Sequence, residues 1–141
     1  IVEVGFGDYN LAKNYRLREG KNWVGYDVVS SLLRPNETNR TFKLMDNIFN
    51  FHEEGDLLIE KDVIQHWPNE AVEYFHEQII PRYKYALITN DHYLRKTPRP
   101  NINYGQYQPM NVDEKRPNIL VMTKSYSASV KKTYLYPGWP K

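Results

Sequence analysis

The stretch that decides the fold is Ile1-Val2-Glu3-Val4-Gly5-Phe6-Gly7-Asp8-Tyr9, at the start of the sequence. Its first four residues are apolar apart from one acid, a pattern that is typical of a strand in a protein core. Gly5 and Gly7 then allow the backbone to turn tightly and to approach a ligand closely. A helix after the turn would present free N–H groups and a positive dipole end. The stretch therefore predicts a ligand-binding turn between a strand and a helix.

Beyond this turn, short apolar segments alternate with segments of helical pattern, which indicates a largely parallel sheet. We expect helices over 10–18 and 69–79, and only a short, irregular helix between Asp27 and Phe42. The expected strands are 1–4, 23–26, 42–45, 56–60, 84–89, 118–123 and 131–136.

The C-terminal part of the chain has a different character. Segment 92–117 contains four prolines and shows little periodicity, and a loop of that length inside a domain is usually functional. The last two strands are joined by the short segment 124–129, which permits an antiparallel hairpin and leaves no room for a crossover helix. The sheet should therefore be parallel, with an antiparallel pair at its C-terminal end.

Composition narrows the class of protein. The chain has 141 residues, 40% of them hydrophobic and 26% charged, which fits one folded soluble domain over 1–141 and a cytoplasmic location. The absence of cysteine excludes disulfides, thiolate zinc sites and cysteine nucleophiles. No apolar run approaches the roughly 20 residues that span a bilayer. Because the chain opens inside a strand at Ile1, we expect residues that precede it to be missing from the sequence.

Charge and histidine spacing bear on partners and metals. The formal net charge of +2 gives no support to electrostatic capture of nucleic acid, although it does not forbid it. The four histidines lack metal-ligand spacing, so no metal site is expected.

Two acids follow the glycine turn at intervals that suit a nucleoside. Asp27, twenty residues beyond Gly7, ends the second expected strand, where a carboxylate can accept hydrogen bonds from both ribose hydroxyls. Asp46 follows the third strand, and the adjacent Asn47 suits an exocyclic amine. The alternative is a structural turn followed by two aspartates that cap helices.

The residues around the glycines separate two kinds of cofactor. A dinucleotide fingerprint needs a third small residue where this chain has Asn10. Glu3 would lie unfavourably beside a pyrophosphate, but it suits a ligand with an ammonium or sulfonium group. The residues therefore favour S-adenosylmethionine over NAD.

The sequence resembles the class I S-adenosylmethionine-dependent methyltransferases. Glu3–Asp8 resembles their first motif, Asp27 their ribose-binding acid, Asp46 and Asn47 the pair at the adenine, and Asp62–Trp67 the segment beside the transferred methyl group. The resemblance implies a three-layer α/β sandwich with strand order 3-2-1-4-5-7-6 and S-adenosylmethionine as the cofactor. Tyr9 replaces the third glycine of the motif, and we expect its side chain to narrow the loop or to shield the methionine moiety.

The candidate catalytic residues are His66 and Asp62, which follow the fourth expected strand. His66 could remove a proton from an attacking oxygen or nitrogen, or only orient the acceptor, or simply begin the next helix beside a buried Trp67. Asp62 could act on the acceptor or accept a backbone or cofactor hydrogen bond. The candidate cofactor-binding residues are Glu3, Gly5, Gly7, Asp27, Asp46, Asn47 and Asp62.

Further segments could face an acceptor. Tyr104, Tyr107 and Tyr126 could form an aromatic wall or only pack the long loop onto the sheet, and Asn90–His92 could line the acceptor side or cap a turn. The run 95–99 is expected to be a solvated basic loop.

These observations give one expected function and several alternatives. We expect methyl transfer from S-adenosylmethionine to an undetermined small-molecule acceptor. The alternatives are a catalytically inactive binding subunit with the methyltransferase fold, and an enzyme that cleaves S-adenosylmethionine itself. An NAD-dependent oxidoreductase is disfavoured by Asn10 and Glu3. The oligomeric state stays open.

Overall fold

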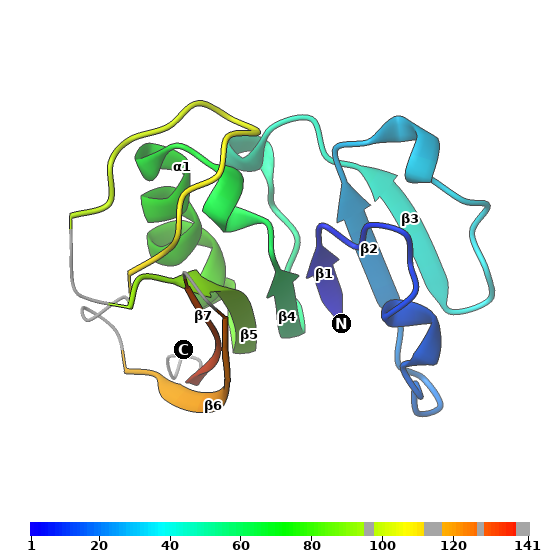
Figure 1. The fold of residues 1–141 in the computed structure, drawn as a ribbon. Helices are drawn as coiled ribbons and strands as arrows, with labels where there is room; N and C mark the ends of the chain where they lie inside the picture. Colours follow the sequence, from blue (N-terminus) through cyan, green and yellow to red (C-terminus); the bar gives the residue numbers. More distant parts are fainter. Residues whose placement is uncertain (95–97, 112–116, 127–128, 138–141) are drawn as a thin grey trace.

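The computed structural model describes residues 1–94, 98–111, 117–126 and 129–137, which form a seven-stranded mixed sheet (Figure 1). The strands are β1 (Val2–Val4), β2 (Trp23–Asp27), β3 (Arg40–Leu44), β4 (Gly55–Lys61), β5 (Tyr83–His92), β6 (Ile119–Ser125) and β7 (Val130–Pro137). Their order is β3-β2-β1-β4-β5-β7-β6, with β1 to β5 parallel and β7 antiparallel to β5 and to β6. The expected α/β class, strand order and antiparallel hairpin are confirmed.

The register of the parallel strands brings the functional segments to one edge of the sheet. Val4 lies opposite both Tyr26 and Glu60, and Glu60 lies opposite Ile88. The residues that follow these positions along the chain therefore leave the sheet together, at its carboxyl edge, where open α/β sheets bind ligands.

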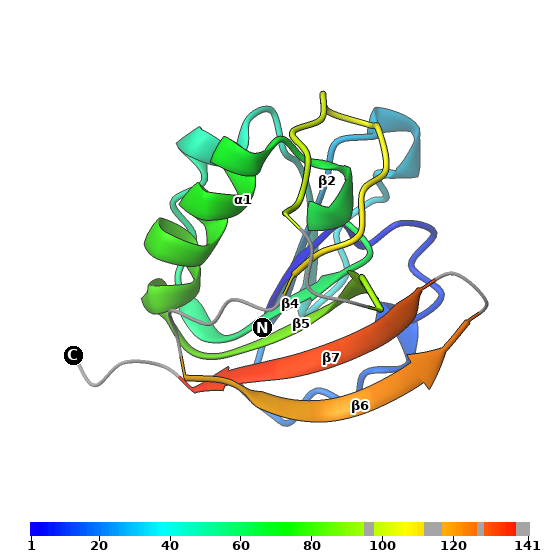
Figure 2. The same cartoon turned by 60° about the vertical axis from the view of Figure 1, so that its left-hand side comes forward.

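The two faces of the sheet are covered differently. On one face lies α1 (Asn69–Tyr74), which continues as a π-helix over Phe75–Ile79, and this face holds the larger apolar core (Figure 2). On the other face, an aromatic cluster that includes Trp23 packs beneath the loop after β1. No helix within the described ranges is long and apolar enough to cross a membrane.

Two of the three helix predictions are confirmed in outline, and one is wrong. The helix expected over 69–79 begins at Asn69 and changes from α to π geometry at Phe75. A short 3-10 helix over Ser30–Leu32 lies where a short, irregular helix was expected.

The helix expected over 10–18 is reduced to a 3-10 turn over Ala12–Asn14. The guanidinium of Arg40 accounts for part of this difference, because it donates to the carbonyl oxygens of Ala12 and Tyr15, at 2.8 Å each. The Ala12 carbonyl also accepts the Tyr15 N–H of the 3-10 turn at 3.1 Å, whereas the Tyr15 carbonyl is bound to this side chain of β3 where a longer helix would bind it to its own backbone.

Candidate functional site

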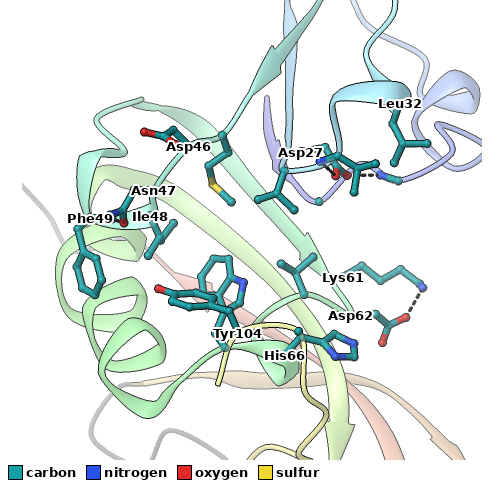
Figure 3. Close-up of a pocket in the computed structure, with 18 residues that line it drawn as sticks. Asp27, Leu32, Asp46, Asn47, Ile48, Phe49, Lys61, Asp62, His66 and Tyr104 are labelled. Atoms are coloured by element: carbon teal, nitrogen blue, oxygen red, sulfur yellow. Dashed lines mark hydrogen bonds and ion pairs between the residues drawn. The ribbon is translucent and has the colours of Figure 1, made fainter. Parts of the chain in front are cut away.

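A cavity of about 770 Å³ opens at the carboxyl edge of the sheet, and its size lies in the range of small-molecule sites. Figure 3 shows Asp46 and Asn47 on one wall, with Asp62 and His66 across from them. Seven of the eight predicted site residues line this cavity: Gly5, Gly7, Asp27, Asp46, Asn47, Asp62 and His66.

The glycine turn packs against the loop that follows β4. Both glycines have a positive φ, +75° at Gly5 and +57° at Gly7. A Cβ on Gly5 would lie 2.1 Å from Cγ2 of Val63, whereas a Cβ on Gly7 would have no atom within 4 Å. Gly5 is therefore required for close packing within the protein, and Gly7 leaves open space on the cavity side of the turn.

Asp27 connects the glycine turn to the end of β2. Its carboxylate is buried, with 6% of the residue exposed, and it accepts hydrogen bonds from the N–H of Gly7 at 2.9 Å and of Val29 at 3.0 Å. Each bond goes to a different carboxylate oxygen, so each oxygen keeps a free lone pair. Asp27 is thus fixed by the backbone and can still accept two hydrogen bonds from a ligand.

Asp46 and Asn47 lie where the chain leaves β3. Asp46 is exposed at the cavity wall. The side chain of Asn47 accepts a hydrogen bond from the N–H of Phe49 at 3.0 Å and so caps a 3-10 helix over Ile48–Asn50. The amide nitrogen of Asn47 is the part of this side chain that could still bind a ligand.

Glu3 lies outside the set of residues that line the cavity. It is 3% exposed and accepts a hydrogen bond from Nε1 of Trp23 at 2.9 Å. Burial raises the pKa of Glu3, and hydrogen bonds from Trp23 and Tyr15 together with the charge of Lys61 counteract this effect. Its assignment to the cofactor stays a prediction.

Tyr9 does not narrow the glycine loop, and that expectation is wrong. The residue adopts a left-handed conformation with φ +66°, and its ring is buried against Trp23 and Phe42, at centroid distances of 5.6 and 5.0 Å. The left-handed backbone directs the side chain into the aromatic cluster, and Tyr9 is not among the residues that line the cavity.

Asp62 is held by two lysines. Its carboxylate pairs with Nζ of Lys61 at 2.5 Å and with Nζ of Lys131, and its φ is +62°. Burial acts to raise the pKa of Asp62, but the two ammonium groups outweigh it and hold the pKa below its ordinary value. An ionised, doubly paired carboxylate is better suited to fix neighbouring groups than to carry a proton during a reaction.

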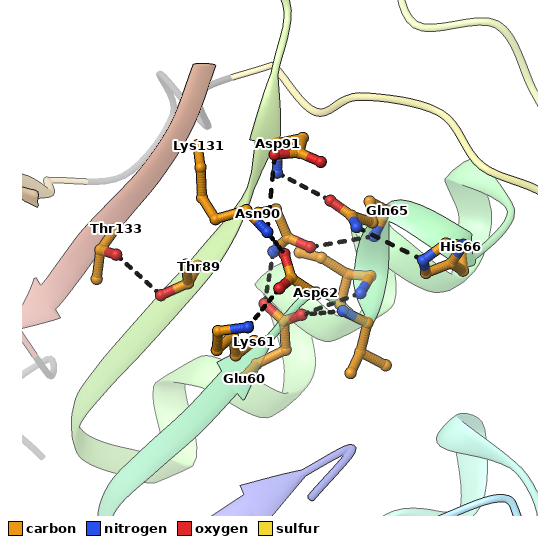
Figure 4. A network of polar contacts seen from close by, with 12 residues as sticks. Glu60, Lys61, Asp62, Gln65, His66, Thr89, Asn90, Asp91, Lys131 and Thr133 are labelled. Atoms are coloured by element: carbon orange, nitrogen blue, oxygen red, sulfur yellow. Dashed lines mark hydrogen bonds and ion pairs between the residues drawn. The ribbon is translucent and has the colours of Figure 1, made fainter. Parts of the chain in front are cut away.

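Glu60, which was not predicted as a site residue, is the buried carboxylate that organises the loop after β4 (Figure 4). One of its oxygens accepts from the N–H groups of Val63 and Ile64, at 2.7 and 3.1 Å, and the other accepts from Nδ2 of Asn90 at 2.6 Å. Burial raises the pKa of Glu60 to about 7, against the lowering effect of these hydrogen bonds. The available signal was an acid directly after the apolar run 57–59 of a strand.

Glu60→Gln should remove a pH dependence from the stability of the fold. From pH 4.5 to about 7 the unfolded chain has lost the Glu60 proton while the folded chain keeps it, so the free energy of unfolding falls as pH rises. The raised pKa corresponds to a fall of about 3 kcal/mol across this window. Urea denaturation at several pH values should show the fall in the wild type and a flatter profile in the variant.

Parallel slopes in the two proteins would contradict this prediction. Other groups that titrate in the same pH range affect both proteins equally, so the comparison removes their contribution. One such group is His92, whose pKa is lowered to about 4 by burial.

The segment 98–111 covers the part of the cavity that contains His66. Its contacts to the segment after β4 include three bonds of 2.9 Å each, from Arg99 Nη2 to the Trp67 carbonyl, from the Gly105 N–H to the His66 carbonyl, and from the Gln108 N–H to the Gln65 carbonyl. Arg99 is therefore half-buried and holds the segment in place, whereas a solvated basic loop was expected over 95–99. Residues 95–97 of that expected loop lie outside the described residues.

The three tyrosines of the expected aromatic wall do different things. Tyr104 lines the cavity and is 54% exposed. The hydroxyl of Tyr107 donates to Oδ2 of Asp91 at 3.1 Å, and the ring of Tyr126 lies beneath the ammonium of Lys124. Of the three, only Tyr104 is a wall residue of this cavity.

His66 does not begin the next helix, because α1 begins at Asn69, and its role toward an acceptor stays a prediction. His66 ends a 3-10 helix over Ile64–His66 and lines the cavity, while Trp67 is buried behind it. Across the part of the chain that the structure describes, no group of three or more histidines and acids is placed to hold a metal ion.

Comparison with known proteins supports the fold. Neither a protein-family model nor a curated protein matches the sequence. The crystal structure of the N-terminal domain of EvdMO1 in the presence of SAH and D-fucose matches 98% of this chain and 75% of that chain, with a TM-score of 0.73 and 8% identity. The chain has a methyltransferase fold. A second structure supports this statement. Magnesium protoporphyrin IX methyltransferase (ChlM) from Synechocystis PCC 6803 with bound SAH matches 98% of this chain and 73% of that chain, with a TM-score of 0.62 and 12% identity.

A third structure agrees with these two. The DhpI–SAH complex matches 97% of this chain and 76% of that chain, with a TM-score of 0.57 and 11% identity. The resemblance to class I methyltransferases is therefore confirmed at the level of the fold over nearly the whole chain.

Proposed function

We propose that this protein transfers a methyl group from S-adenosylmethionine to a small-molecule acceptor. The observation that carries the proposal is the position of Gly5, Gly7 and Asp27 around one cavity at the carboxyl edge of the sheet. It is supported by a fold shared with proteins crystallised with SAH.

The residues of the cavity fit this cofactor. Asp27 keeps two free lone pairs for the ribose hydroxyls, and Asp46 and Asn47 provide polar groups for the adenine beside the buried Met45 and Ile48. The open space at the glycine turn would hold the methionine moiety. When bound, S-adenosylmethionine supplies an electrophilic methyl group on a sulfonium centre.

The chain's own residues would bind and align the acceptor. His66, on the cavity wall, is the residue placed to accept a proton from a hydroxyl acceptor. Asp62, paired with Lys61 and Lys131, would keep the loop and its charges in place. Tyr104 and the buried Trp67 would exclude water from this part of the cavity.

A small-molecule acceptor is supported by the solved structures and by charge. One neighbour was crystallised in the presence of D-fucose, and another is a magnesium protoporphyrin IX methyltransferase. A match to the Pnkp1/Rnl/Hen1 RNA repair complex, with a TM-score of 0.57, covers 36% of that chain. The net charge of +2 gives no electrostatic preference for nucleic acid.

Calorimetric titration with S-adenosylmethionine and S-adenosylhomocysteine tests the proposal. We expect micromolar binding by the wild type and binding weaker by about tenfold or more in Asp27→Asn, because a ribose would lose a charged acceptor. Asp56→Asn is the matched control, since Asp56 is exposed and paired with Lys21 on the surface.

Absence of binding by folded wild-type protein would contradict the proposal. Binding without methylation in an acceptor screen would favour the inactive binding subunit. Analysis of the reaction products would reveal cleavage of the cofactor itself.

A further inference from the structure

We propose that Gln65 and Asp91 are positioning residues that fix the proton of His66 on Nδ1 and leave Nε2 as its basic nitrogen. The use of this nitrogen in methyl transfer rests on the proposed function. The position of the proton rests on contacts within the chain alone.

The contact at Nδ1 requires a proton on that nitrogen. Nδ1 of His66 lies 3.1 Å from the carbonyl oxygen of Gln106. A carbonyl oxygen can only accept a hydrogen bond, so the imidazole is the donor. The N–H of Gly105 donates to the His66 carbonyl at 2.9 Å, and the ring of Tyr107 lies 5.8 Å from the His66 ring, so the loop is held against the histidine at three points.

The contact at Nε2 requires the absence of a proton there. Nε2 of His66 lies 3.5 Å from Nε2 of Gln65. The orientation of the Gln65 amide is fixed because its oxygen accepts the N–H of Asp91 at 2.8 Å. The amide nitrogen, which can only donate, therefore faces the ring. A proton on Nε2 of His66 would point at the hydrogens of this amide.

Asp91 holds Gln65 and two residues of the segment that carries Gln106. Its N–H fixes Gln65 (Figure 4). Its carboxylate accepts the Tyr107 hydroxyl at 3.1 Å, and its carbonyl accepts the Met110 N–H at 2.7 Å. Asp91 belongs to β5, which pairs with β4 and β7, so the anchor is part of the sheet.

The two contacts assign the same tautomer independently. The tautomer of a neutral histidine is set by the hydrogen bond of its other nitrogen, and here a backbone carbonyl and an oriented amide act together. The hydrogen bond at Nδ1 also fixes the plane of the ring at the cavity wall. Nε2 carries the free lone pair of the neutral ring, and a proton from an acceptor hydroxyl could reach it only where the Gln65 amide gives up its 3.5 Å contact.

The proton can be located by NMR without cofactor or acceptor. Long-range proton–nitrogen correlation spectra of protein with isotope-labelled histidine distinguish the two tautomers, and His66→Gln assigns the signal of His66. In the spectrum of the neutral imidazole, we expect a protonated Nδ1 and a bare Nε2.

A matched pair of variants tests the role of Gln65. Gln65→Glu keeps an oxygen for the Asp91 N–H and turns an acceptor toward the ring, so Nε2 should gain a proton while the Gln106 carbonyl keeps the proton on Nδ1. Gln78→Glu adds the same charge on the exposed surface and should leave the spectrum unchanged.

A proton on Nε2 in the wild type would overturn the assignment, and an unchanged His66 signal in Gln65→Glu would overturn the role of Gln65. Both readings are independent of the titration with S-adenosylmethionine. A failure of the proposed function and a failure of this inference are therefore distinguishable.

Discussion

The Gly5→Ala variant is expected to lose about 2–5 kcal/mol of folding free energy and at least tenfold in affinity for S-adenosylmethionine. The new Cβ would have to adopt a φ of +75°, and it would lie 2.1 Å from Cγ2 of Val63. Both residues line the cavity, so relief of the overlap must change the shape of the proposed cofactor site. Urea denaturation and calorimetric titration measure the two effects.

Gly20→Ala separates the clash from backbone strain. Gly20 has a φ of +73°, but a Cβ there would meet no atom within 4 Å. This control should therefore cost only about 1 kcal/mol and leave binding unchanged. Val63→Ala in the Gly5→Ala background should restore part of the stability. Equal losses in Gly5→Ala and Gly20→Ala would show that the contact with Val63 carries no energy.

The sheet could be predicted from the sequence because its strands and its hairpin follow from short local stretches, and its strand order follows from the family resemblance. Apolar runs such as 57–59 locate buried strands, and a hairpin connection as short as 124–129 leaves only an antiparallel pairing. The strand order came from the resemblance alone. Once strands are parallel, the residues after their carboxyl ends must meet, which is why Gly5, Gly7 and Asp27 line one cavity.

The features that the sequence did not predict depend on contacts between segments that are distant along the chain. The helix expected over 10–18 gives way to contacts with Arg40, which lies in another strand. The orientation of His66 depends on the carbonyl of Gln106, forty residues away in a segment without periodicity. Glu60 was missed because an acid at the end of a strand looks exposed until the loop that buries it is known.

Trp23→Phe should destabilise the protein by about 2–4 kcal/mol near neutral pH, and by less in acid. The fully buried Trp23 donates its indole N–H to Glu3 at 2.9 Å. Burial raises the pKa of Glu3, so the folded protein favours the neutral acid. The free energy of unfolding therefore falls as pH rises above 4.5, because the unfolded chain loses the Glu3 proton at a lower pH than the folded chain. The indole N–H is one of the groups that offset this fall.

The pH dependence distinguishes the hydrogen bond from simple packing. Without the indole donor, the pKa of Glu3 should rise further, so the penalty of Trp23→Phe should grow as pH increases, as measured by urea denaturation from acid to mildly alkaline pH. Glu3→Gln in the same background removes the ionisable group and should flatten the profile. A penalty that is the same at every pH would mean that Trp23 acts through volume alone. The Trp23 indole would then not stabilise the ionised form of Glu3.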